Sequence, residues 1–211
     1  MIANKKELRF YIMADRMMNR GYFKLPLSKR LLRMLYPDHV MNYLEHMRKF
    51  SYYENHRSGI VGKWRYFWHK SRYYQLGLKC GFSIGKDCFG YGLTLLHYGS
   101  IVVGQRNRIG NYAIVFPASC IVDDGSVIGD GLFMATGAVI SKQLVLGDAV
   151  NVAANSVLAQ SCPDGYVTFA GAPAKQVKEN PQPWYSGIWG SDTRWLDRVS
   201  RVEDLRQQLL G

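Results

Sequence analysis

His97 is the residue whose type and position are best suited to chemistry in this chain of 211 residues. It lies in the segment Gly-Leu-Thr-Leu-Leu-His97-Tyr-Gly, one six-residue step before Val103, at a position where the surrounding pattern otherwise has an aliphatic side chain. The pKa of an unperturbed imidazole lies near working pH, so a histidine that interrupts an apolar register is a candidate general base. A structural histidine is the alternative that this position alone leaves open.

The residues that follow His97 repeat with a period of six. A row of aliphatic residues at this spacing runs from Val103, and after a slip of one residue six consecutive pairs join an aliphatic residue to a small one. Chance would give two or three such pairs in a chain that is 47% hydrophobic. A hexapeptide that forms one side of a triangular coil gives about 18 residues per turn, so the pattern predicts a parallel β-helix. The pairs are Ile128-Gly129, Met134-Ala135, Ile140-Ser141, Leu146-Gly147, Val152-Ala153 and Leu158-Ala159.

Composition divides the chain into three parts. Residues 1–80 form a basic, aromatic-rich segment with helical spacing, residues 81–178 form the repeat domain, and residues 179–211 form a tail with a helix over 193–210. The segment 63–78 alternates aromatic and cationic residues. Two roles are open for it as a helix: it covers the open end of the β-helix, or it lies on a membrane surface. The apolar stripe of the C-terminal helix predicts packing against the body or against another subunit.

Charge and cysteine content limit the partners and the compartment. The net charge is +11, and residues 1–80 carry 17 lysines and arginines against five acidic residues, so the basic excess lies in this segment. Such a surface favours an anionic partner, but no nucleic-acid-binding module accompanies it, so we expect no nucleic acid. The N-terminus shows no signal-peptide pattern, and the four cysteines form no Cys-x-x-Cys pair. We therefore expect a cytoplasmic protein, with the inner face of the membrane as an open location.

The stretch 90–177 resembles the hexapeptide-repeat acyltransferases, and most closely their serine acetyltransferase-like branch. That family has a left-handed parallel β-helix, so the resemblance implies a mainly β fold with an N-terminal α-helical segment and a C-terminal helix. The closing motif is specific for the superfamily, whereas it says little about the acceptor. The matching segments are Gly-Leu-Thr-Leu-Leu-His97-Tyr-Gly-Ser-Ile-Val-Val-Gly104, Ala-Ala-Asn-Ser-Val-Leu158 and Ala170-Gly-Ala-Pro-Ala-Lys175.

The resemblance implies an acetyl-CoA-dependent O-acetyltransferase and a role for each matching residue. His97 would be the general base that deprotonates an acceptor hydroxyl during direct attack on the thioester, and a backbone N–H would stabilise the oxyanion. The pantetheine arm of acetyl-CoA would run past Thr136 and Ala154, and Lys175 and Lys178 would meet its phosphates. The family further implies a homotrimer with active sites between subunits and no metal.

Three departures from the serine acetyltransferase pattern bear on the acceptor. Ser83 stands where the family has an aspartate that orients the histidine, and Asp87 is the nearest carboxylate in sequence. The short segment 122–126 replaces a glycine-rich loop that helps to hold serine. The N-terminal segment is also shorter and more basic than the family's. This combination resembles the branch of the family that O-acetylates sugars of capsular or exopolysaccharide, which implies a saccharide acceptor that is acidic or lipid-linked.

The sequence therefore predicts an enzyme that acetylates a sugar hydroxyl in capsular or exopolysaccharide biosynthesis. Serine O-acetyltransferase of cysteine biosynthesis is the alternative within the same chemistry, and a non-catalytic β-helix scaffold is the alternative in another class. A carbonic anhydrase on the same coil is excluded, because its zinc needs three histidines from neighbouring coils and His97 is the one histidine within the repeats.

Overall fold

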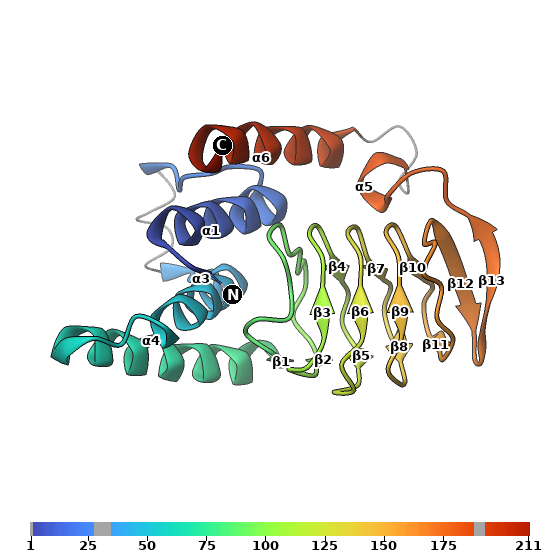
Figure 1. The fold of residues 1–211 in the computed structure, drawn as a ribbon, viewed down its shortest axis with the longest axis horizontal. Coiled ribbons are helices and arrows are strands. Elements are labelled where there is room, and N and C mark those ends of the chain that lie inside the picture. Colours follow the sequence, from blue (N-terminus) through green and yellow to red (C-terminus); the bar gives the residue numbers. More distant parts are fainter. Residues whose placement is uncertain (1, 28–34, 188–192) are drawn as a thin grey trace.

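The computed structural model describes residues 2–27, 35–187 and 193–211. A parallel β-helix forms one end of the molecule, on the right in Figure 1. The helices are α1 (Lys5–Arg20), α3 (His39–Glu54), α4 (Gly59–Cys80), α5 (Trp184–Gly187) and α6 (Arg194–Leu210). The helices α1, α3 and α4 are stacked against the N-terminal end of the β-helix, and the C-terminal helix runs across the top (Figure 1). None of these helices is long and apolar enough to cross a bilayer.

Three sheets of short parallel strands form the three faces of about five coils. We call them faces A, B and C in the order in which the chain visits them. Face A contains β1 (Phe82–Ile84), β2 (Ile101–Val103), β5 (Ser119–Ile121), β8 (Val139–Ile140) and β11 (Val157–Leu158). Face B contains β3 (Arg108–Ile109), β6 (Val127–Ile128) and β9 (Val145–Leu146). Face C contains β4 (Ile114–Val115), β7 (Phe133–Met134), β10 (Asn151–Val152), β12 (Val167–Gly171) and the antiparallel closing strand β13 (Ala174–Glu179).

The six-residue pattern fills the interior of the coil, as the sequence predicts. Every aliphatic residue of the six pairs is buried, and so is the row from Val103 to Ile121. On face A, Val103 pairs with Ile121 and Ile121 with Ile140, so each coil stacks its inward residue on that of the coil before. The predicted left-handed β-helix fold with flanking helices is confirmed.

His97 departs from the register expected for it. Its side chain is exposed and does not fill an inward slot. The inward positions of that part of the chain are Leu93 and Leu95, which are fully buried. The chain leaves the regular coil after Leu95 and turns outward before β2 begins at Ile101, so stepping back six residues from Val103 does not reach an interior position.

The helices α1, α3 and α4 cover the open end of the first coil and hydrogen-bond to its backbone. On face A the Tyr73 hydroxyl donates to the carbonyl of Ile84. On face B, Arg48 donates to the carbonyls of Phe89 and Gly90 at 2.8 and 2.6 Å. These bonds occupy carbonyls that have no strand on that side. Of the two roles left open for residues 63–78, covering the end of the β-helix is seen in the structure, through the inner face of α4.

A buried ion pair supports this cap. Arg48 donates from Nε to Asp15 Oδ2 at 2.8 Å, and both side chains are almost fully buried. Asp15 also accepts the backbone N–H of Leu93 at 3.0 Å on face C. Next to it, Asn19 donates to the carbonyl of Leu93 and accepts from the N–H of Leu95. Two helices are thereby attached to the same coil.

The C-terminal helix packs against the body, as its apolar stripe predicts. Trp195, Val199 and Val202 of α6 are buried in a second apolar cluster with Phe10 and Met17 of α1. Residues 31–34, for which the sequence shows helical spacing, lie outside the described residues.

We predict that Asp15→Ala lowers the free energy of unfolding by about 3–5 kcal/mol, because Arg48 is then left buried without a counter-charge. Urea denaturation followed by circular dichroism measures the change. Glu45→Ala is the matched control: Glu45 pairs with Arg16 and Lys49 at a partly exposed site, so its loss should cost less than about 1 kcal/mol. Equal losses in the two variants would contradict the prediction.

Two imidazoles face each other between α3 and α4. His46 Nδ1 and His69 Nδ1 are 2.9 Å apart, a distance at which one ring donates and the other accepts. Desolvation lowers the pKa of each imidazole to about 4, and nearby Lys49 acts in the same direction on both. Between about pH 4 and pH 6.5 both rings therefore stay neutral in the folded protein, whereas a free histidine is protonated in this range.

This histidine pair should lower the free energy of unfolding as the pH decreases. Between about pH 6.5 and pH 4 these two histidines bind protons in the unfolded chain but not in the folded chain. The free energy of unfolding therefore decreases as the pH falls through this range. In the variant His46→Gln/His69→Gln that decrease should be smaller, as measured by urea denaturation at a series of pH values. The control His56→Gln should keep the wild-type slope.

Candidate functional site

The candidate site lies at the corner where face C turns into face A. Val115 pairs with Met134 and Met134 with Val152, and two residues further along the coils this register places Pro117, Thr136 and Ala154 in one column. The backbone bonds across the corner agree, since Gly137 donates to the carbonyl of Pro117 and Asn155 to that of Thr136. Thr136 and Ala154 are therefore one coil apart, and both are exposed.

His97 lies at the same corner on the first coil, but outside the column. Thr94 bridges to Ile114 on face C and Ile101 pairs with Ser119 on face A, so the first coil has two more residues at this corner than the next coil, and His97 lies in this longer connection. Coils are spaced by ~4.8 Å, so the coil of Ala154 lies about 14 Å from the first coil along the coil axis. The imidazole lies against Phe116, with ring centroids 6.2 Å apart, and Phe116 is 5.7 Å from Phe133 on the next coil. An exposed base thus stands at one end of a corner that runs along the coils.

The end of α4 is attached to the loop that carries His97. The N–H of Gly99 donates to the carbonyl of Cys80, the last residue of α4, at 3.0 Å. Gly81 follows with φ +77°, and a Cβ there would lie 2.9 Å from the carbonyl oxygen of Gly99. Glycine is required here both by the positive φ and by this close approach.

The carboxylate nearest to His97 in sequence does not orient its ring. Asp87 accepts hydrogen bonds from Ser51 and from Lys86, both on the side of the cap. Within the described ranges no hydrogen bond to the imidazole of His97 is found. Asp87 is therefore excluded as the orienting group, and Ser83, on the outer side of β1, lines a separate groove beside α4.

A cation that sequence reasoning missed comes from α1. Arg20 donates to both carboxylate oxygens of Asp38, at 2.7 and 2.9 Å. The hydrogen bond to Asp38 raises the pKa of Arg20, and the phenol of Tyr98, the neighbour of His97, adds a smaller contribution in the same direction. The end of α1 thus places a guanidinium near Tyr98, the residue that follows His97. No spacing in the sequence relates residue 20 to residue 97.

A cleft of about 660 Å³ opens beside the corner, between face C and the chain that returns from β13 to α5. It contains two of the predicted site residues, Ala154 and Lys178, whereas Thr136 and Lys175 are outside its lining. Lys178 pairs with Thr168 and Lys175 with Ala170 across the β12–β13 hairpin, and both lysines are exposed. The lining residues are Phe133, Ala135, Asn151, Ala153, Ala154, Thr168, Lys178, Asn180, Pro181, Gln182, Pro183 and Trp184.

One wall of the cleft carries an unsatisfied polar atom. Asn151 donates to the Thr168 hydroxyl at 3.4 Å, and Thr168 donates to Asn180 Oδ1 at 2.8 Å. Asn151 is buried, and its Oδ1 has no hydrogen-bond partner. A buried acceptor without a partner is costly, so it is suited to receive an N–H from a ligand. The opposite wall is fixed by Trp184, whose Nε1 donates to the carbonyl of Tyr112 at 2.7 Å.

Comparison with known proteins gives partial likenesses. No protein-family model matches the chain. A serine acetyltransferase of Staphylococcus aureus is 30% identical over 107 residues, which cover 47% of this chain and 47% of that protein. The bifunctional protein GlmU of Stenotrophomonas maltophilia is 30% identical over 78 residues, or 37% of this chain and 17% of that protein. The chain thus spans less than half the length of these curated relatives.

Solved structures match over more of the chain. The serine acetyltransferase of Neisseria gonorrhoeae superposes with a TM-score of 0.62 at 20% identity, covering 86% of this chain and 70% of that one. A soybean serine acetyltransferase complexed with serine gives a TM-score of 0.60 at 21% identity over 81% and 69%. A serine acetyltransferase in complex with CoA gives 0.55 at 21% identity over 81% and 68%. The chain is thus a hexapeptide-repeat protein with the left-handed β-helix fold of the serine acetyltransferases.

Proposed function

We propose that this chain transfers an acetyl group from acetyl-CoA to the hydroxyl of an acceptor, with His97 as general base. The observation that carries the proposal is the corner between faces C and A. The exposed imidazole lies there on the first coil, and Pro117, Thr136 and Ala154 follow on the next coils, with Ala154 in the cleft that Lys178 also lines. A base, a row of residues along one corner and a cation at the far end of that row suit an acyl-CoA thioester.

The cleft suits the pantetheine arm and the phosphates of CoA. Its volume lies in the range of cofactor sites. The unpartnered Asn151 Oδ1 is an acceptor for an amide N–H of pantetheine, and the small side chain of Ala154 lets the arm approach the backbone. Lys178 extends along the same wall and, with Lys175 on the same strand, supplies positive charge for phosphate. A relative solved in complex with CoA adds support.

In the proposed reaction His97 accepts the proton of the acceptor hydroxyl while the hydroxyl oxygen attacks the thioester carbon. The new C–O bond forms, the C–S bond breaks, and the imidazolium returns its proton to the leaving thiolate. The exposure of His97 leaves the ring open to the acceptor from the solvent side, and Phe116 supports its other side. No acyl-enzyme is needed, because His97 acts on the acceptor.

For the acceptor, the comparisons favour serine over the saccharide expected from the sequence. The structures that match are serine acetyltransferases, one of them complexed with serine. A site for serine needs a cation that balances its carboxylate, and the structure brings Arg20 of α1 near Tyr98, the residue that follows His97. We therefore place serine first, with Arg20 as the group that faces its carboxylate.

A saccharide remains the second candidate, on a specific observation. β5 ends at Ile121 and β6 begins at Val127, so the connection that would carry a serine-holding loop is a short corner. Arg20 is moreover already paired with Asp38, which weakens the electrostatic attraction between its guanidinium and a second carboxylate. Neither feature favours the small amino acid serine, and both are compatible with a larger acceptor such as a saccharide.

We also propose that copies of the chain assemble as a trimer with the corner at the interface. The outward side chains of face A are Ser83, Val102, Cys120, Val139 and Val157, a column without charge that a second coil can cover. A copy packed there would border the corner and close the site. Acetyl-CoA is a cytoplasmic metabolite, so the proposal keeps the chain in the cytoplasm.

We expect His97→Ala to lower kcat/KM about 10²–10⁴-fold while leaving the KM for acetyl-CoA nearly unchanged, because a general base acts on the chemical step. The measurement is CoA release with serine and, in parallel, with purified acidic polysaccharide. Because His97 is exposed, the variant should fold normally. His56→Ala, on the cap, is the control and should keep full activity.

Retention of more than a tenth of the wild-type rate in His97→Ala would remove His97 as the base. The acceptor that supports turnover decides between serine and saccharide. If neither does, and calorimetry shows no heat of acetyl-CoA binding, the chain is a scaffold and the proposal fails.

A bulky side chain in the cleft should block CoA. We predict that Ala154→Trp raises the KM for acetyl-CoA by about tenfold or more, which corresponds to ~1.4 kcal/mol of lost binding. Gln160→Trp is the matched control, since Gln160 is exposed at the next corner and outside the cleft lining. Initial rates at varied acetyl-CoA give both values, and equal KM values for the two variants would place CoA elsewhere.

A further inference from the structure

The helix α4 has an apolar stripe that nothing in the described structure covers. At 100° per residue its members fall on one side of the helix over roughly 27 Å. The exposed fractions are high: 89% for Ile60, 62% for Trp64, 63% for Phe67 and 87% for Leu78. We define the α4 stripe as Ile60, Trp64, Phe67, Tyr74 and Leu78, with Val61 and Trp68 at its border.

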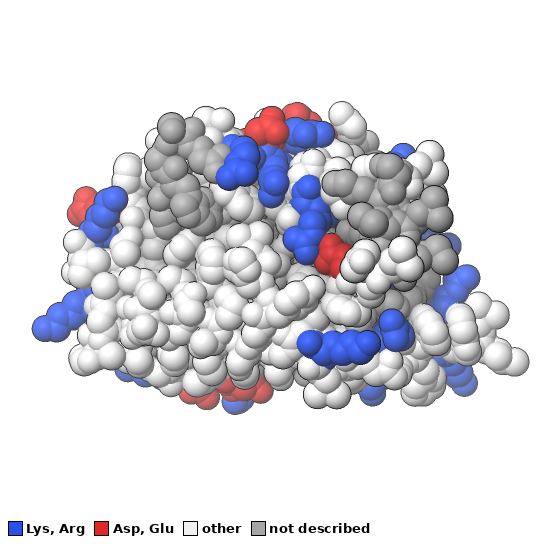
Figure 2. Space-filling model, turned by 180° about the vertical axis from the view of Figure 1, so that it is seen from behind, with Lys and Arg blue, Asp and Glu red and all other residues white. Residues whose placement is uncertain are grey.

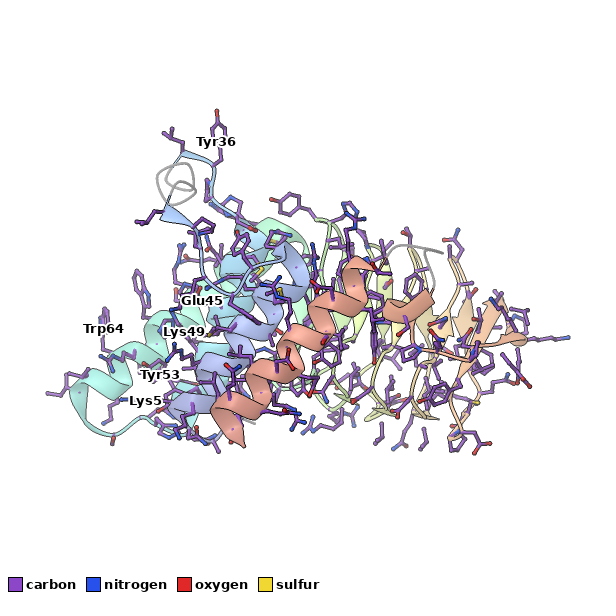
Figure 3. All side chains as sticks on the ribbon, turned by 90° about the horizontal axis from the view of Figure 1, so that it is seen from above. Lys5, Tyr36, Glu45, Lys49, Tyr53 and Trp64 are labelled. Atoms are coloured by element: carbon purple, nitrogen blue, oxygen red, sulfur yellow. The ribbon has the colours of Figure 1, made fainter. Side chains whose placement is uncertain are left out.

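The opposite side of α4 is already packed. Tyr66, Tyr73 and Leu76 are buried there, and Tyr73 stacks on Tyr43 of α3 with ring centroids 5.2 Å apart. Trp64 projects away from α1 and α3 (Figure 3) and stacks on Trp68 at 5.9 Å. The stripe is therefore not part of the cap, since the cap uses the other face of the same helix.

Cations lie on both flanks of the stripe. By helical angle Lys63 and Lys70 are on one side and Arg65, Arg72 and Lys79 on the other, and α4 contains no acidic residue. In Figure 2 the lower right of the surface, where α4 lies, shows Lys and Arg among uncharged residues and no acidic side chain. An apolar band between two cationic borders is the pattern of a helix that lies in a membrane interface.

We propose that α4 docks through this stripe onto a phospholipid surface that carries negative charge. Tryptophan and tyrosine rings favour the headgroup level, and the apolar side chains between them enter the acyl boundary. The flanking lysines and arginines reach the anionic headgroups, each adding to the attraction. This surface activity goes beyond the proposed acetyl transfer and does not depend on it.

Charge argues against a second copy of the chain as the occupant. Two α4 stripes packed together would bring the cations of both helices to one seam, and α4 has no carboxylate to balance them. Like charges at such a seam repel, whereas an anionic lipid surface neutralises them. Self-association through the α4 stripe in place of lipid binding would overturn the proposal.

The experiment is co-sedimentation of the full chain with vesicles of phosphatidylcholine alone or mixed with phosphatidylglycerol. We expect binding to the mixed vesicles that weakens as salt is raised. Trp64→Ser/Phe67→Ser should lower the partition coefficient about tenfold or more. The control Val127→Ser/Val145→Ser removes two exposed apolar residues from face B and should bind as wild type.

A second pair of variants tests the charge. Lys63→Gln/Lys79→Gln should weaken binding about fivefold or more for each lysine removed. The control Lys24→Gln/Lys142→Gln removes two exposed lysines outside α4 and should have little effect. Together the two variants and their controls distinguish insertion of the α4 stripe into the bilayer from nonspecific electrostatic attraction between a basic protein and an anionic surface.

The proposal is overturned if wild type binds both vesicle types equally weakly, or if the stripe variant binds as well as its control. It is also overturned if sedimentation shows an oligomer that the stripe variant alone disperses, without vesicle binding. Its failure is distinguishable from failure of the proposed function. His97→Ala should bind vesicles as wild type, and the stripe variant should keep its rate with a soluble acceptor.

Discussion

The open first coil must have its backbone satisfied, and the rest of the structure depends on how this is done. A β-helix of stacked parallel strands exposes unpaired N–H and C=O groups at its end. Here Asp15, Asn19, Arg48 and Tyr73 reach them from α1, α3 and α4, so that each of the three faces receives a side-chain partner. The Asp15–Arg48 pair is buried because each partner satisfies both the other and the coil.

The same cap also determines which side chains lie near the loop that carries His97. Because α1 is fixed through Asn19 to Leu93 and Leu95, its last residues lie beside the loop that follows, and Arg20 comes near Tyr98. Further along face C, α6 and the chain around Trp184 cover the outer side chains but leave the corner free. The cleft lies between this corner and the chain around Trp184.

The repeat, its inward residues and the flanking helices could be predicted, because period six leaves few arrangements of aliphatic residues. The orientation of His97 could not, since it depends on where the chain leaves the coil after Leu95. Asp15 and Arg48 look like ordinary surface charges, and their burial follows from packing between distant helices. Lys178 and Ala154 were predicted and share a cleft, but the unsatisfied Asn151 in its wall was missed because strand pairing makes it buried.

The junction between Cys80 and Gly99 fixes the phase of α4 relative to the coil. One backbone hydrogen bond and a left-handed glycine connect the end of the helix to the loop of His97. Inserting a single residue in α4 before this junction would rotate everything upstream by 100° and advance it by 1.5 Å. The tyrosines that pack on α3 would then turn toward solvent. Helix length is thus constrained at this junction as strictly as residue type, whereas additions to a coil corner leave the cap undisturbed.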